Sequence, residues 1–122
     1  LHPALDLDAM NMACGQMLGR HDFSCFQRTG SDNRTSICEV RQAEWAATGA
    51  GYRFTITADR YLRNMVRAIV GTCIRIGIGH WPATSMADVM ASGNRARAGK
   101  SAPACGLYLS RIVYPFIPPE NP

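Results

Sequence analysis

Two strand-like segments separated by a short glycine-containing turn constrain the fold of this chain more than any other feature. Residues 37–47 form the first segment and residues 51–58 the second. In the second segment apolar and polar residues alternate, and the apolar set is Tyr52, Phe54, Ile56 and Ala58. Alternation with a period of two is typical of a strand with one buried face. The pair therefore predicts a β-hairpin whose apolar face is covered by other elements. The first segment alternates poorly, so its edges are less well defined.

A long helix is expected directly after the hairpin, from Arg60 to about Ile76. Asp59 is the expected N-cap of this helix. Its apolar residues recur every three to four positions, and they are Leu62, Met65, Val66, Ile69, Val70 and Cys73. Three basic residues are then expected to lie together on a different face of the helix: Arg60, Arg63 and Arg67.

Shorter elements are expected on either side of these two. Residues 8–18 predict an amphipathic helix that begins at Asp8 and ends at Gly19. A second short helix is expected from Ser85 to Ala91, followed by a basic loop. Residues 107–114 predict a last strand. The order helix, strand, strand, helix, helix, strand indicates one α+β domain over the whole chain, with an antiparallel sheet and helices packed on one face.

The charge of the chain favours a polyanionic partner. Its formal net charge is +4, and twelve of the thirteen basic residues are arginine. Between Arg53 and Arg111 there are nine basic residues and two acidic ones, so nine minus two gives +7 in that part alone. Arginine makes bidentate contacts to phosphate and stacks on bases. Solvated surface charge is the alternative interpretation of the same pattern.

Several classes of protein and site have no support in the sequence. No apolar run reaches membrane-spanning length, and Leu1–Leu7 carries no signal-peptide pattern, so we expect a cytoplasmic protein. The five cysteines are widely spaced with no C-x-x-C pair, which predicts reduced, mostly buried thiols and no metal site. No phosphate-binding loop or hydrolase motif is present, and no cofactor is expected. Because the chain starts with Leu1 rather than Met, we expect a fragment or a processed product.

Residues 58–72 carry the most informative motif, A-D-R-Y-L-R-N-M-V-R-A-I-V-G-T. This segment resembles the TruA-type tRNA pseudouridine synthases, in which a strand ends and a helix begins around an M-V-R-x-I-V-G core. Three further matches to this family occur in the family's order, at residues 21–26 with Arg34 downstream, at residues 97–103, and at residues 106–115. Together the four matches cover most of residues 10–115.

The resemblance implies half of a pseudouridine synthase fold and a part in an isomerase. The family converts uridine to pseudouridine in the tRNA anticodon stem-loop, at positions ~38–40, on a base that must leave its stack, and it uses neither metal nor organic cofactor. Its key acid is an aspartate in an R-T-D-type motif, whereas Arg34-Thr35 is followed here by Ser36. The aspartate and the active-site tyrosine of the family belong to an N-terminal half. The chain is therefore expected to be a C-terminal half of a homodimeric enzyme, inactive without the missing half.

Two supporting site residues carry over from the family. Arg67 would pair with the absent aspartate and hold that carboxylate ionised and oriented. From periodicity alone, Arg67 would instead be an exposed helix arginine. Leu107 would form an apolar wall of the base pocket, and it can be an ordinary core strand residue at the same time.

The candidate RNA contacts are basic residues that flank Arg67 in the expected fold. Phosphate contacts of this kind fix the register of the RNA and give an affinity that depends on salt. The candidates are Arg28, Arg34, Arg60, Arg63, Arg95, Arg97 and Lys100. Possible stacking partners for an extruded base are His21, Tyr61 and Trp81, with packing as the alternative for Tyr61 and Trp81.

Two other interpretations stay open beside the enzyme half. A stand-alone RNA-binding module could use one face of the sheet, although the aromatic strand pattern of such modules is missing. A dimerisation domain is the other, supported by the apolar tail from Tyr114 to Pro122. Adding the missing N-terminal half separates the three, because only the enzyme half predicts that activity appears.

Overall fold

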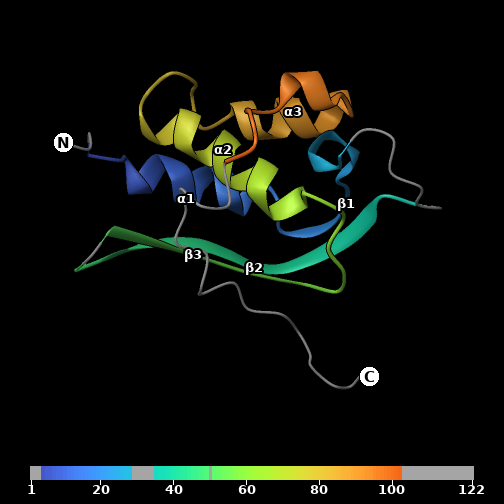
Figure 1. Ribbon diagram of the computed structural model, residues 1–122, viewed down its shortest axis with the longest axis horizontal. Helices are drawn as coiled ribbons and strands as arrows, with labels where there is room; N and C mark the ends of the chain where they lie inside the picture. The colour runs from blue at the N-terminus through green and yellow to red at the C-terminus, as the bar shows by residue number, and fades with distance from the viewer. Residues whose placement is uncertain (1–3, 29–34, 50, 103–122) are drawn as a thin grey trace.

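The computed structural model describes residues 4–28, 35–49 and 51–102, which form a three-stranded antiparallel sheet with helices packed on one of its faces (Figure 1). The strands lie in the order β1-β2-β3, with bounds Gly19–Asp22, Ile37–Thr48 and Gly51–Ala58. The helices are α1 (Leu7–Gly15), α2 (Met65–Gly77) and α3 (Ser85–Ser92), with short 3₁₀ turns η1 (Ser24–Phe26) and η2 (Arg95–Arg97). The predicted α+β class, with helices on one face of an antiparallel sheet, is confirmed.

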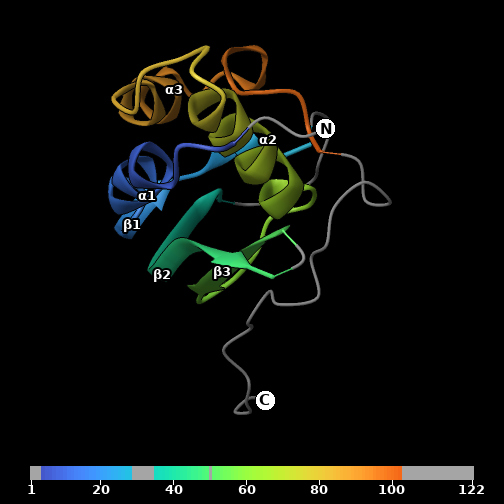
Figure 2. The same cartoon turned by 90° about the vertical axis from the view of Figure 1, so that its left-hand side faces the viewer.

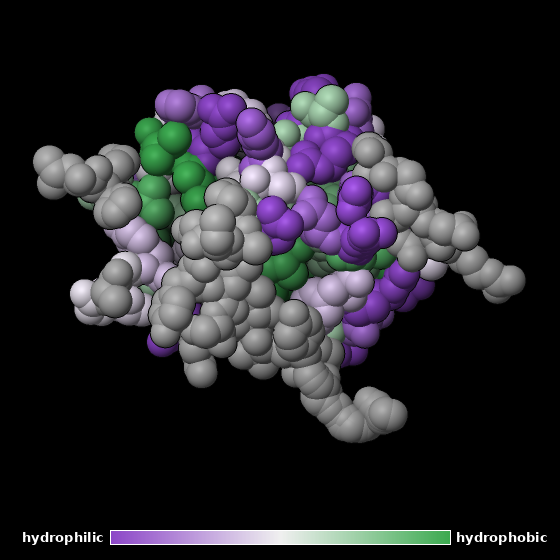
Figure 3. All heavy atoms as spheres, in the orientation of Figure 1, coloured by the Kyte–Doolittle hydropathy of each residue, from purple (hydrophilic) through white to green (hydrophobic). Residues whose placement is uncertain are grey.

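The hydrophobic core lies between the sheet and the helices. Figure 2 shows α1 and α2 placed between the sheet and α3. The largest fully buried side chains come from every layer and include Met10, Phe23, Phe26, Ile56, Met65, Ile69, Ile76 and Met86. Burial of one such side chain stabilises the fold by about 1.5–3 kcal/mol. On the face seen in Figure 3, hydrophilic side chains cover most of the helical layer, and apolar areas are small.

The hairpin formed by β2 and β3 is confirmed, and its irregular first strand has a physical cause. The pairing of β2 with β3 shifts register between Val40 and Gln42, which marks a β-bulge. Arg41 and Gln42 are consequently both exposed, and this breaks the alternation of buried and exposed residues. Beyond the bulge, the rings of Trp45 and Phe54 are cross-strand partners that stack with centroids 4.9 Å apart.

The N-terminal elements differ from the expectation in two ways. α1 begins one residue earlier, because the Asp6 carboxylate accepts the capping hydrogen bond from the Ala9 N–H at 3.0 Å, while Asp8 lies in the first turn. The helix also ends at Gly15, and Gly19, with φ of +98°, instead begins β1. This strand was not predicted from the sequence. Its four residues are largely exposed and show no apolar alternation, so they carried no strand signal.

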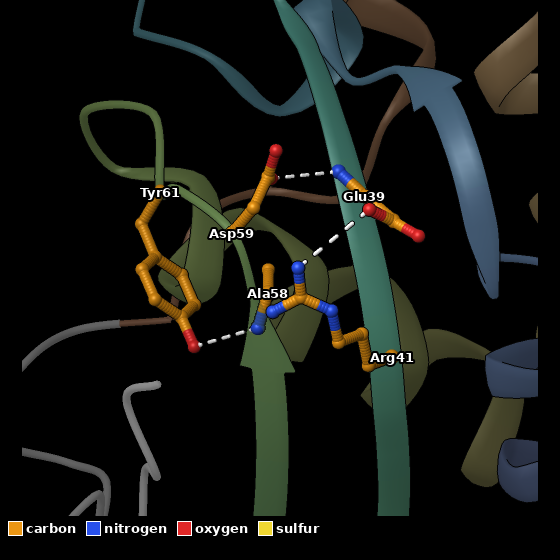
Figure 4. Close-up of polar contacts among 5 residues, drawn as sticks. All are labelled: Glu39, Arg41, Ala58, Asp59 and Tyr61. Atoms are coloured by element: carbon orange, nitrogen blue, oxygen red, sulfur yellow. Dashed lines mark hydrogen bonds and ion pairs between the residues drawn. The ribbon is translucent and has the colours of Figure 1, made fainter. Parts of the chain in front are cut away.

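The expected N-cap and start of the long helix are wrong. The Asp59 carboxylate accepts from the backbone N–H of Glu39 at 2.8 Å, and the Asp59 N–H donates back to the Glu39 carbonyl at 3.0 Å (Figure 4). Asp59 thus joins the end of β3 to β2 and does not cap a helix. α2 starts only at Met65, so Arg60 and Arg63 precede the helix and do not share a helical face with Arg67.

The last described elements follow the sequence pattern. α3 runs over the expected residues and one more, to Ser92, and is followed by the C-cap Gly93, whose left-handed φ of 59° suits a glycine. The segment expected as a basic loop forms η2 and then an irregular stretch to residue 102. The strand expected at residues 107–114 lies outside the described residues. No helix in the described ranges is long and apolar enough to cross a bilayer.

Candidate active-site and RNA-contact residues

Arg67 lies in the first turn of α2, and its half-buried side chain reaches the stretch that follows η2. The guanidinium Nε donates to the carbonyl oxygen of Ala102 at 2.8 Å, and the Ala102 N–H donates to the Arg67 carbonyl at 3.1 Å. Since Nε is engaged, a ligand would meet the two terminal nitrogens. These have no hydrogen-bond partner among the described residues.

Asn64 and Arg95 meet at the neighbouring hydroxyl of Ser101. The Asn64 side-chain amide donates to Ser101 Oγ at 2.6 Å, and Arg95 Nη2 donates to the same oxygen at 2.7 Å. Arg95 Nη1 also donates to the Gly99 carbonyl at 3.1 Å. Arg95 is therefore held by the 98–102 segment, hereafter the docking loop, and lies half-buried.

The docking loop approaches the backbone of α2 closely. A Cβ built at Gly71 would collide with the Lys100 carbonyl, and one at Gly99 would lie 2.8 Å from the backbone of Thr72. The Gly99 N–H donates to Thr72 Oγ1 at 2.8 Å, in the buried space between the two segments. Two glycines thus permit the contact, and a buried threonine fixes its register.

No carboxylate lies within 4.0 Å of Arg67 in the described part of the chain. An ion pair on the sheet joins Arg41 and Glu39 at 3.6 Å (Figure 4). Those two side chains are 52% and 47% exposed, so their pair contributes at most about 1 kcal/mol. The terminal nitrogens of Arg67 are suited to receive a carboxylate from another segment.

The segment before α2 holds two of the basic candidates, Arg60 and Arg63, and a third, Arg28, is joined to it by its backbone. Arg60 is half-buried, and its Nη1 donates to the carbonyls of Thr35 and Ile37 at 2.8 and 3.1 Å. Arg63 is exposed, and its carbonyl accepts from the backbone N–H of the exposed Arg28 at 3.0 Å. Arg60 is thus partly used in holding the start of β2, while the side chain of Arg63 faces solvent.

Arg97 and Lys100 are exposed at and beyond η2. Arg97 lines an open surface cavity of about 210 Å³ together with Trp81 and Asp88. The guanidinium of Arg75 lies over the ring of the half-buried Trp81, with Arg75 Cζ 5.6 Å from the ring centroid. Arg34 and Leu107, the remaining candidates, lie outside the described residues.

The other two aromatic candidates make local contacts. The Tyr61 hydroxyl accepts from the Ala58 N–H at 3.0 Å and donates to the Ile56 carbonyl at 3.1 Å, which fixes this half-buried ring at the end of β3 (Figure 4). His21 pairs through Nε2 with the Leu18 carbonyl at 2.7 Å. Tyr61 and Trp81 are half-buried and pack against the hydrophobic core, which agrees with the packing interpretation, and base stacking by either ring stays a prediction.

Buried thiols do not supply a nucleophile here. Cys14, Cys25, Cys38 and Cys73 are free and buried, as predicted. Burial raises the pKa of Cys25 to about 12 and that of Cys38 to about 11. The pKa of Cys14 is also raised, mainly by its hydrogen bond with Cys73 and to a smaller extent by burial. These three thiols stay protonated near neutral pH. Among the described residues no cluster of three metal-ligating side chains occurs.

The family model described as tRNA pseudouridine synthase matches residues 13–115. This range contains the three strands, α2 with Arg67, and the docking loop.

The chain belongs to the tRNA pseudouridine synthase family.

Relatives within the tRNA pseudouridine synthase family agree with this assignment. A protein named tRNA pseudouridine synthase A from Porphyromonas gingivalis is 46% identical over 114 residues, which are 91% of this chain and 45% of the relative. Its namesakes from Parabacteroides distasonis and Azorhizobium caulinodans are 40% and 38% identical over 111 residues, covering 91% of this chain and 44% and 43% of theirs. The chain spans about half the length of the curated relatives it matches.

The Arg67 cluster comprises Asn64, Arg67, Arg95, Ser101 and Ala102. Three of these residues were not predicted from the sequence as site residues. They are Asn64, Ser101 and Ala102. Ala102 accepts from Arg67, Ser101 accepts from Arg95, and Asn64 donates to Ser101. All three lie inside the segments that resemble pseudouridine synthases, so the motif matches marked the region. Their contacts, however, span 35 and 37 residues of sequence, and helical or strand periodicity carries no information on such pairs.

Proposed function

We propose that this chain is the C-terminal half of a tRNA pseudouridine synthase, and that it supports conversion of uridine to pseudouridine in the anticodon stem-loop, at positions ~38–40, on an extruded base. The observation that carries the proposal is the arrangement of Arg67. Its Nε is fixed by Ala102, and its terminal nitrogens are unpaired among the described residues. Family membership over residues 13–115 supplies the reaction class.

The reaction needs one positioned acid and no redox partner. The bond between N1 of the base and C1′ of the ribose breaks, and a bond between C5 and C1′ forms. The proton on C5 is lost to solvent, and N1 gains a proton, so atoms and electrons balance without a cofactor. The aspartate that acts on the nucleotide would come from the missing N-terminal half.

Arg67 would act on that aspartate through its planar fork. A guanidinium binds both oxygens of a carboxylate at once and favours the ionised form of the acid. Because the Ala102 carbonyl holds Nε, the carboxylate would pair with the two terminal nitrogens. Leu107 is proposed, from the family resemblance, as an apolar wall of the base pocket.

The exposed basic residues are proposed to contact the tRNA backbone. Arg63, Arg97 and Lys100 are exposed, whereas Arg60 and Arg95 use part of their donors within the chain. The first group fits phosphate binding more directly. Arg28, which is exposed and has an interaction of its own, and Arg34 belong to the proposal on sequence grounds. We propose further that the complete enzyme is a cytoplasmic homodimer, as the resemblance implies.

A sheet-face RNA module receives less support from the described residues. Such modules stack bases on exposed aromatic side chains of their strands. In the hairpin, Trp45 and Phe54 are buried, and the hydroxyl of the half-buried Tyr52 accepts from the Leu5 N–H at 3.2 Å. The aromatic residues of the hairpin therefore face the helices.

Reconstitution tests the proposed function. The chain would be mixed with the N-terminal half of the Porphyromonas gingivalis relative, and release of tritium from C5 of uridine in tRNA would be measured. We expect release from the mixture and none from either half alone. Tritium release by the isolated chain would contradict the proposal that the catalytic aspartate lies in the other half. Absence of tritium release from a mixture whose halves are folded and associated would contradict the proposed enzyme activity.

A further inference from the structure

Ser101 connects two side chains that come from different elements of the fold. Its Oγ accepts from Asn64, at the start of α2, and from Arg95, in η2. The next residue, Ala102, exchanges two hydrogen bonds with Arg67, one through the side chain and one through the backbone. The Ser101 hydroxyl, which Asn64 and Arg95 share, thus lies in the residue directly before the Ala102 carbonyl that holds the Arg67 guanidinium.

The remaining part of the docking loop is fixed by independent contacts. The Gly99 N–H donates to Thr72 Oγ1 at 2.8 Å, and the Gly99 carbonyl accepts from Arg95 at 3.1 Å. The close packing of Gly71 against Lys100 prevents the loop from moving toward the helix. The loop is anchored at Gly99, so the orientation of its far end, with the Ala102 carbonyl, depends on the Ser101 contacts together with the backbone hydrogen bond from the Ala102 N–H to the Arg67 carbonyl.

Asn64 has a backbone conformation that gives its side chain a specific purpose. Its φ is 70°, and no other non-glycine residue in the described ranges has a positive φ. Residues other than glycine occupy this left-handed region at a cost. The Asn64 side chain does not cap α2, and its amide donates to Ser101 instead. A glycine would satisfy the backbone at least as well, but it could not make this contact.

We propose that Ser101 is a positioning residue for Arg67, which acts by joining Asn64 and Arg95 and thereby fixing the Ala102 carbonyl that directs the guanidinium. The inference rests on the proposed function, which gives Arg67 a carboxylate partner. Bidentate pairing requires the fork to lie in the plane of that carboxylate, and a small misplacement of a catalytic group lowers turnover strongly. Ser101 itself need not touch the nucleotide.

The first arm of the test uses the 122-residue chain and needs no activity. Exchange of the Arg67 Hε proton with water would be measured by nuclear magnetic resonance for the parent chain and for Ser101→Ala, Ser101→Thr and Ser92→Ala. Ser92 is a matched control, because its hydroxyl donates to Val89 inside α3. We expect Ser101→Ala to accelerate exchange by ~10-fold or more, with Ser101→Thr and Ser92→Ala close to the parent.

The second arm uses the reconstituted synthase. Ser101→Ala is expected to lower kcat by about 10- to 100-fold while KM for tRNA changes by about twofold or less, and Ser101→Thr restores most of the rate. Asn64→Gly keeps the left-handed backbone but removes the amide, and it should reproduce the loss. An unchanged Hε exchange in Ser101→Ala would overturn the inference. So would a loss that appears in KM alone, or one that threonine does not rescue.

The two arms separate the inference from the function on which it rests. If reconstitution yields no activity while Hε exchange responds as expected, the proposed function fails and the structural link from Ser101 to Arg67 stands. If activity appears but Ser101→Ala behaves as the parent in both arms, the positioning role fails and the proposed function stands.

Discussion

Gly71 of α2 lies against the backbone carbonyl of Lys100, with no room for a Cβ atom between them. A helix interior ordinarily disfavours glycine relative to alanine by about 1 kcal/mol. At Gly71 the close approach of the docking loop reverses that preference. The glycine is required so that the loop can reach Arg67.

Gly71→Ala should therefore destabilise the chain, by about 1–3 kcal/mol, because the added methyl group must push the loop away from α2. Urea unfolding followed by circular dichroism measures the change. Gly15→Ala is the matched control, since a Cβ at Gly15 meets nothing within 4 Å. Equal effects of the two substitutions would contradict the steric argument.

Arg67→Lys in the reconstituted enzyme should reduce kcat by ~10-fold or more and leave tRNA affinity within about twofold. Lysine keeps the charge but loses the planar fork that orients a carboxylate. The substitution also removes the hydrogen bond to Ala102, which should cost about 1 kcal/mol of folding stability. Single-turnover kinetics and tRNA titrations separate these effects. Normal kcat would place Arg67 among the surface arginines.

Replacement of Arg63, Arg97 and Lys100 by glutamine should weaken tRNA binding and flatten its salt dependence. For each phosphate that is no longer neutralised by a basic side chain, the plot of log K against log salt becomes shallower by about 0.7–0.9. Arg53→Gln is the control, because Arg53 is exposed on the sheet in β3, away from η2 and the docking loop. Titrations at several salt concentrations give the slope. A larger effect of Arg53→Gln would favour the sheet face as the RNA-binding surface.

The free energy of unfolding should fall as the pH rises from about 9 toward 11. Burial raises the pKa of Cys38 from 9.0 to about 11, so above pH 9 the unfolded chain releases this thiol proton while the folded chain keeps it. The stabilisation by the protonated thiol is complete below pH 9 and is lost through pH 11. Cys38→Ala should make the decline of stability with pH shallower, whereas Ser92→Ala should not. Parallel curves for both variants would refute this origin.

The sequence predicted those parts of the fold in which one residue pattern dominates. The hairpin follows from the alternation in residues 51–58, and α3 lies where a short helix is expected, from Ser85. The start of α2 could not be predicted, because Asp59 has two possible partners and the backbone of Glu39 on the neighbouring strand is the one it binds. The preference of aspartate for helix N-caps does not reveal that a residue of a neighbouring strand competes for the same carboxylate.

The candidate site was predictable to a similar extent. The M-V-R motif singled out Arg67, and the charge pattern indicated the basic residues around it. The role of Arg95 could not be anticipated, because its guanidinium binds Gly99 and Ser101 in the docking loop. The sequence pattern does not distinguish an arginine whose guanidinium is free to bind phosphate from one whose guanidinium is hydrogen-bonded within the chain.

Asn64 leaves the start of α2 without a side-chain cap, since its amide is directed to Ser101. The first N–H groups of a helix carry the positive end of its dipole, equivalent to about half an elementary charge. Arg67 lies in that same first turn. A carboxylate that reaches its guanidinium would therefore meet a second positive potential, from the peptide groups themselves, which does not depend on the pH.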